Sequence, residues 1–191
     1  ASKLGADRIE FCSKLDEDGL TPKIEELLLI KKLVDIPIRV MVRPHSKSFV
    51  YNSKDIEKMK NTIDLCKENN FDGVVFGCLK SNNELDLSLI SELANYSKPL
   101  NVIIHKAIDL TNSPLESLKN LIGLSNIDGV LTSGGYQTAQ LGISILKQMI
   151  NICPKGFEII SAGKITNENI IFLHDKIQGQ YYHGKKIVGE L

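Results

Sequence analysis

Short apolar runs recur along the chain at nearly even intervals, separated by longer segments that mix apolar and polar positions. Each run is rich in Val, Ile, Phe or Tyr and is too short for a helix, so the runs predict β-strands. Their near-continuous apolar character is typical of parallel strands that are buried on both faces. The predicted strands cover residues 8–13, 38–43, 73–78, 101–105, 129–133, 157–161 and 180–183.

The segments between these runs have helical spacing and recognisable helix starts. Thr21-Pro22 predicts an N-cap followed by proline at the first helical position, ahead of apolar residues that begin at Ile24. Ser113-Pro114 predicts a second start of the same kind. Alternation of strands and helices with a repeat of about 28 residues indicates βαβ units with right-handed crossovers.

Two architectures fit such a repeat, a closed (β/α)8 barrel and an open doubly wound sheet. The open sheet would ideally carry a glycine-rich dinucleotide turn after its first strand, and no GxGxxG or GxxxxGK[ST] motif occurs. The even spacing therefore favours an α/β fold of the TIM-barrel type. Because residues 1–5 have the pattern of a helix end, we expect the first β-strand and most of the first helix to be missing from this chain. Residues 1–191 are then a single, N-terminally incomplete TIM-barrel domain.

The amino-acid composition limits which classes of binding partner we expect. The chain has 23 Lys and Arg against 23 Asp and Glu, so charge gives no reason to expect a nucleic acid or a membrane surface as partner. The apolar runs are too short to span a bilayer, and no secretory signal is visible. The four cysteines form no CxxC pair and are expected to be reduced thiols in a cytoplasmic protein. The sequence leaves room for a homo-oligomer without predicting one.

Candidate catalytic residues lie where the predicted strands end, because barrels of this type place their active sites there. His105 ends one strand and Asp109 follows it, an arrangement suited to general acid–base chemistry or to metal ligation, or to a purely structural histidine. Arg43 could hold a carboxylate or phosphate, or form an ion pair with Glu10. Glu10 lies within an apolar strand, where an unpaired carboxylate is costly, so it should have a partner or a role.

Further candidates are glycine-rich turns and one thiol. The turn Ser133-Gly134-Gly135 could offer backbone N–H groups to an anionic substrate, and Gly163 and His183 lie at neighbouring strand ends. Cys12 lies two residues after Glu10, so both side chains should project to the same side of the strand, where a thiol could bind Cu(I). The other cysteines have a structural interpretation: Cys78 should face a helix, Cys66 lies on an apolar helical stripe, and Cys153 lies in a loop.

Several segments, in order and spacing, resemble the CutC family of copper homeostasis proteins. The resemblance extends from Gly5 to Gly184 and is carried by GADRIEFC, GLTP, VMVRP, DGVVFG, HKAID, LTSGG and the final HG. It implies a TIM barrel whose first strand is absent here, and a cytosolic protein linked to copper tolerance and Cu(I) binding. Of the family's two copper-binding cysteines, one matches Cys12 and the other belongs to the first strand.

In the family, polar side chains gather at the mouth of the barrel, the end at which the strands finish and the βα loops begin. By resemblance, the corresponding residues here are Glu10, Arg43, His105, Asp109 and His183. The chain departs from the family pattern at 106–108, at 161–164 and at 45–47, the last two being loops where an anion would be held. The resemblance as a whole leads us to expect a copper homeostasis protein with copper (Cu(I)) as its ligand. The alternative is a TIM-barrel enzyme that uses the His105/Asp109 pair on a small anionic metabolite, and the sequence does not decide whether any reaction is catalysed.

Overall fold

The computed structural model describes residues 1–190 and contains one parallel sheet whose strands follow one another in chain order. Every strand pairs in parallel with the next, which requires a crossover between each pair. All seven predicted strands are confirmed. They are β1 (Ile9–Phe11), β2 (Ile38–Met41), β3 (Gly73–Phe76), β4 (Asn101–Ile104), β5 (Gly129–Thr132), β6 (Glu158–Ser161) and β7 (Tyr181–Tyr182).

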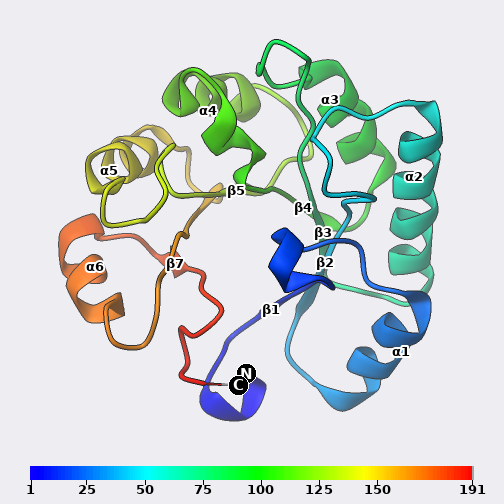
Figure 1. Ribbon diagram of the computed structural model, residues 1–191, viewed down its shortest axis with the longest axis horizontal. Coiled ribbons are helices and arrows are strands. Elements are labelled where there is room, and N and C mark those ends of the chain that lie inside the picture. The colour runs from blue at the N-terminus through cyan, green and yellow to red at the C-terminus, as the bar shows by residue number, and fades with distance from the viewer. Residues whose placement is uncertain (191) are drawn as a thin grey trace.

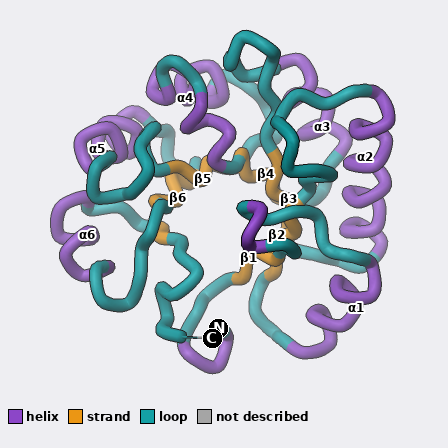
Figure 2. The backbone as a smooth tube through the Cα atoms, viewed as in Figure 1, coloured by secondary structure: helices purple, strands orange, loops and turns teal. Residues whose placement is uncertain are grey.

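Helices form an outer ring around the strands, as Figures 1 and 2 show. They are α1 (Ile24–Leu33), α2 (Ser53–Glu68), α3 (Leu87–Tyr96), α4 (Pro114–Ile122), α5 (Ile143–Ile152) and α6 (Ile170–Ile177), with short 3-10 helices η1 (Ser2–Leu4), η2 (Leu15–Glu17) and η3 (Lys106–Leu110). The sheet is curled like a TIM barrel. Within residues 1–190 it stays open between β1 and β7, which do not pair with each other. No helix in this part of the chain is long and apolar enough to cross a membrane.

The two predicted helix starts have different outcomes. Ser113 caps α4 as expected, because its hydroxyl oxygen accepts a hydrogen bond from the Glu116 amide and Pro114 is the first helical residue. The predicted cap at Thr21 is wrong, since α1 begins three residues later at Ile24. The Thr21 hydroxyl instead accepts a hydrogen bond from the Arg43 amide at 2.8 Å and so joins the loop after β1 to the end of β2.

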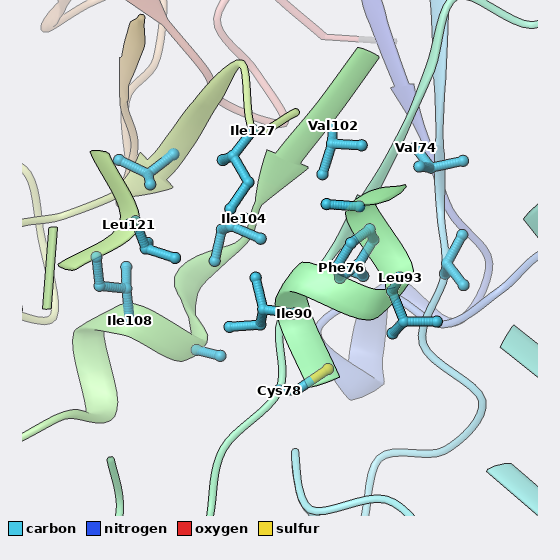
Figure 3. Close-up of a cluster of buried hydrophobic side chains, with 14 of the residues drawn as sticks. Val74, Phe76, Cys78, Ile90, Leu93, Val102, Ile104, Ile108, Leu121 and Ile127 are labelled. Carbon is cyan, nitrogen blue, oxygen red and sulfur yellow. The ribbon is translucent and has the colours of Figure 1, made fainter. Parts of the chain in front are cut away.

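Alternate strand residues belong to two separate apolar clusters. Val74, Phe76 and Ile104 face outward and pack under the helices (Figure 3). The inward positions form a smaller cluster inside the ring, made of Met41, Val75, Ile103, Leu131, Ile160 and Ala162, with Cys12 and Tyr181 packed against it. This alternation of side-chain direction, with a period of two residues, is expected for strands that are buried on both faces. It also determines which polar side chains point into the barrel.

The amino ends of the strands are tied together by ion pairs that the sequence analysis did not predict. Glu158 accepts two hydrogen bonds from Arg39, at 2.7 and 3.0 Å, and two from Arg8, at 2.9 and 3.2 Å. Arg39 also contacts Asp72. Burial acts to raise the pKa of Glu158, but the hydrogen bonds from the two arginines outweigh it and hold that pKa below its ordinary value. This ionic layer closes the end of the barrel opposite the carboxyl ends of the strands.

Candidate functional site

The carboxyl ends of β2, β3 and β4 place Arg43, Gly77 and His105 beside one another. The strand register pairs Val75 with Ile103 and Met41 with Val75, so the inward positions two residues later are these three. Arg43 and His105 are both buried, with exposed fractions of 6% and 4%. The structure therefore places two of the predicted polar residues at the mouth of the barrel.

Arg43 holds the loop that follows β1 across this mouth. Its Nη1 donates to the carbonyl oxygens of Glu17 at 2.8 Å and Gly19 at 3.1 Å, and its guanidinium lies over the Phe49 ring with 4.7 Å to the centroid. Figure 1 shows the η2 segment drawn in dark blue over the ring of strands. The anticipated ion pair between Arg43 and Glu10 is absent from the described residues, since Arg43 binds carbonyl oxygens instead.

The imidazole of His105 lies over Gly77. A Cβ at position 77 would come within 2.7 Å of Nδ1, so only glycine leaves room for the ring. Nδ1 accepts a hydrogen bond from the Ala107 amide at 3.1 Å, and the ring packs against Phe49 in a tilted arrangement, with 4.8 Å between centroids and 55° between the ring planes. Since Nδ1 is an acceptor, the proton of the neutral ring is on Nε2. Burial, reinforced by the nearby charge of Arg43, lowers the pKa of His105 to about 3, so the ring is neutral at physiological pH.

Asp109 does not orient His105, so the predicted hydrogen-bonded pair is wrong. Neither ring nitrogen contacts this carboxylate: Nδ1 binds a backbone amide, and Nε2 is buried without a partner among residues 1–190. Asp109 instead accepts hydrogen bonds from the Thr132 and Ser133 hydroxyls and from the amides of Ser133 and Gly135. The carboxylate of η3 therefore fixes the turn after β5.

The turn Ser133-Gly134-Gly135 binds an anion, as its composition suggested, but that anion is the Asp109 side chain. The remaining amide, that of Gly134, donates to the Thr132 hydroxyl at 2.9 Å. All three amides of the turn are thus occupied within the chain. Both glycines have positive φ, 72° and 84°, which explains their presence at these positions. A substrate anion would have to displace Asp109 to use this turn.

The other candidates lie around the same opening with fewer contacts. At Gly163, where φ is 107°, a Cβ would come within 2.9 Å of the Ser133 Cβ, so this glycine allows the turns after β5 and β6 to pack together. His183 follows β7 and is half-buried, with its amide bonded to the Ser161 carbonyl. Glu10 is half-buried in β1 and has no ion-pair partner among the described residues. Catalysis by Glu10, Arg43, His105 and Asp109 stays a prediction.

Cys12 faces the inside of the barrel directly after β1, as strand parity predicted. It packs against the inner cluster, and its Sγ would lie 3.1 Å from a Cβ built on Gly19, which has φ 87°. Burial, and then the charge of Glu10, raises the pKa of its thiol, while Lys185 acts in the opposite direction. The remaining three cysteines pack in the outer cluster, where burial raises the pKa of Cys66 to about 12 and of Cys153 to about 11, and where Cys78 lies beside α3 (Figure 3).

No group of three or more His, Cys, Asp or Glu residues that could hold a metal ion occurs within the described range. Cu(I) differs from harder cations because it can be held by few ligands, of the thiolate and thioether type.

Sequence reasoning missed Phe49, which covers both Arg43 and His105, because it lies in a loop with no periodic pattern.

A curled parallel sheet with a polar mouth at its carboxyl end defines a TIM-barrel-like α/β protein. The chain belongs to the CutC family, whose sequence profile matches residues 1–188. It is 38% identical over 170 residues to the human copper homeostasis protein cutC homolog, covering 89% of this chain and 62% of that relative. The chain thus spans less than two-thirds of the relative's length.

Solved structures agree with this assignment. The CutC structure from Streptococcus agalactiae superposes with a TM-score of 0.86 at 26% identity, covering 95% of this chain and 89% of that one. A member of the dihydrodipicolinic acid synthase family from E. coli, YagE, superposes with a TM-score of 0.62 at 14% identity, covering 95% and 59%. At that identity the second likeness concerns the fold alone, and it confirms the TIM-barrel type that the strand spacing predicted.

Proposed function

We propose that this protein binds Cu(I) in the cytoplasm and serves copper homeostasis and copper tolerance, with Cys12 as a ligand. The observation that carries the proposal is that Cys12 is the cysteine that faces the barrel interior at the mouth. Cys66, Cys78 and Cys153 pack against the apolar cluster between strands and helices, where a bound ion would lack polar surroundings. Thiolate sulfur is a preferred ligand of Cu(I). The relatives' printed names associate them with copper homeostasis.

The test replaces Cys12 with serine and measures Cu(I) affinity. Cys12→Ser should weaken binding at least about tenfold in competition with a Cu(I) chelator under reducing conditions, because the hydroxyl is a poor ligand for a soft ion. Cys153→Ser is the matched control, since this half-buried thiol packs in the outer cluster, and it should bind as the wild type does. Equal affinity of the wild type and Cys12→Ser would exclude Cys12 as a ligand.

A second candidate function is the binding of a small anionic metabolite, a phosphate or carboxylate, at Arg43 and His105. The observation in its favour is that two buried donors, Nε of Arg43 and Nε2 of His105, have no hydrogen-bond partner within residues 1–190. An unsatisfied buried donor costs about 1–3 kcal/mol, and an oxyanion that accepted hydrogen bonds from these donors would recover that cost and balance the Arg43 charge. Acid–base chemistry through Asp109 is not part of this candidate, since Asp109 binds the turn after β5.

Histidine NMR separates this candidate from a purely structural role for His105. Titration of the 15N-labelled protein with inorganic phosphate should shift the His105 Nε2 resonance to saturation, and acetate should do so more weakly. Arg43→Lys should reduce the phosphate affinity because it removes the guanidinium Nε–H. The exposed His174 on α6 is the internal control. A His105 resonance that does not move with phosphate would contradict anion binding at this site.

A further inference from the structure

Cys12 has a sulfur-bearing neighbour on the adjacent strand. Phe11 of β1 pairs with Val40 of β2, so the next residues along the two strands, Cys12 and Met41, lie side by side on the inner face of the sheet. Both belong to the cluster inside the barrel. A point at the Cβ position of Gly19 lies 3.1 Å from the Cys12 Sγ and 3.7 Å from the Met41 Cε. The two side chains therefore end against the same glycine.

We propose that Met41 supplies the second sulfur ligand, so that Cu(I) is held between the Cys12 thiolate and the Met41 thioether. This inference rests on the proposed function and names a donor that this chain itself supplies in addition to Cys12. Thiolate and thioether are the soft ligand types that select Cu(I) over harder cations. Methionine has three rotatable side-chain bonds, so its sulfur can turn toward the neighbouring strand without movement of the backbone.

The loop after β1 encloses this pair of sulfurs. Gly19 adopts φ 87°, and a side chain there would press on the Cys12 Sγ, so the glycine lets the backbone approach the thiol closely. The loop is held from two sides: Nη1 of Arg43 donates to the Gly19 carbonyl, and Nζ of Lys185 donates to the Leu15 carbonyl at 2.9 Å. Arg43 is thus a positioning residue for the copper site.

The binding step is a ligand exchange without a change in oxidation state. The Cys12 thiol releases its proton to solvent as the sulfur lone pair binds Cu(I) delivered by a soft carrier such as a chelator. Met41 contributes a lone pair and loses no proton. The thiolate and the monovalent ion together are neutral, which lowers the cost of placing them at a half-buried position beside Glu10.

Conservative substitution of Met41 tests the inference. Met41→Leu keeps the side-chain volume and packing but removes the sulfur, so Cu(I) affinity should fall about tenfold while thermal stability is nearly unchanged. Met149→Leu is the matched control, because Met149 on α5 is equally buried but lies in the outer cluster. Its Cu(I) affinity should equal that of the wild type.

A direct structural readout uses selenomethionine at all three methionine positions. X-ray absorption at the selenium edge of the copper-loaded protein should show a copper neighbour, and that neighbour should disappear in Met41→Leu. If Cys12→Ser weakens binding but Met41→Leu does not, and selenium has no copper neighbour, the inference is overturned while the proposed function stands. If Cys12→Ser also leaves the affinity unchanged, the site proposed at Cys12 fails together with it.

Discussion

Gly77 allows His105 to be buried as a neutral ring. The imidazole occupies the volume that any side chain at position 77 would fill, with Nδ1 satisfied by the Ala107 amide and Phe49 packed against the ring. A histidine in this position cannot gain a proton without bringing a second positive charge next to Arg43. The residue is consequently a fixed hydrogen-bond donor at neutral pH rather than a titrating group.

This burial predicts a pH-dependent stability. The folded pKa of His105 is about 3, whereas an unfolded histidine has a pKa of about 6.5. Below pH 6.5 the imidazole is therefore protonated in the unfolded chain but not in the folded chain. Because of this difference, the free energy of unfolding falls as pH decreases from about 6.5 toward 3, by up to about 1.4 kcal/mol per pH unit from this group. Above pH 6.5 the group has no effect.

Urea unfolding between pH 7 and pH 5 measures this slope. His105→Asn retains an acceptor for the Ala107 amide but does not titrate, so its slope should be shallower than that of the wild type over this range. Identical slopes for the wild type and His105→Asn would show that folding does not lower the pKa of His105.

At the level of elements, the loops after β1, β5 and β6 at the mouth are each held by or packed against a residue of a neighbouring loop. Arg43 after β2 holds the loop after β1, and Asp109 of η3, which follows β4, holds the turn after β5. Gly163 after β6 in turn packs against Ser133. These direct contacts join neighbouring loops into a rim around the mouth.

The rim predicts that Asp109 is important for stability. Asp109→Asn replaces one acceptor oxygen with an NH2 group that faces the Ser133 and Gly135 amides. Because an NH2 group cannot accept their hydrogen bonds, these amide donors would be left unsatisfied. We expect a loss of about 2–3 kcal/mol in the free energy of unfolding, with faster hydrogen exchange at these two amides. Asp175→Asn on the exposed side of α6 is the control and should change neither quantity. Slow exchange retained in Asp109→Asn would contradict the role of the carboxylate.

For the molecule as a whole, periodic features were predictable from sequence and pairwise contacts were not. The strands follow from apolar runs, and the inward direction of Cys12 and the outward direction of Cys78 follow from strand parity. By contrast, Arg39 and Glu158 are 119 residues apart, and no local pattern shows that the two meet. The error at Asp109 has the same origin, because a short separation from His105 says nothing about a competing partner that the turn after β5 brings near.

The two ends of the barrel differ in the kind of group that accepts hydrogen bonds from arginine. At the amino ends of the strands the acceptor is Glu158, whose folded pKa is depressed, so its contribution is present above its unfolded pKa and is lost as pH falls through the folded value. At the mouth, Arg43 donates to backbone carbonyls, which no acid in this range protonates. As pH falls through the folded pKa of Glu158, the ion pairs at the amino ends of the strands are therefore lost, whereas the hydrogen bonds from Arg43 to the loop above Cys12 depend on no group that titrates in this range.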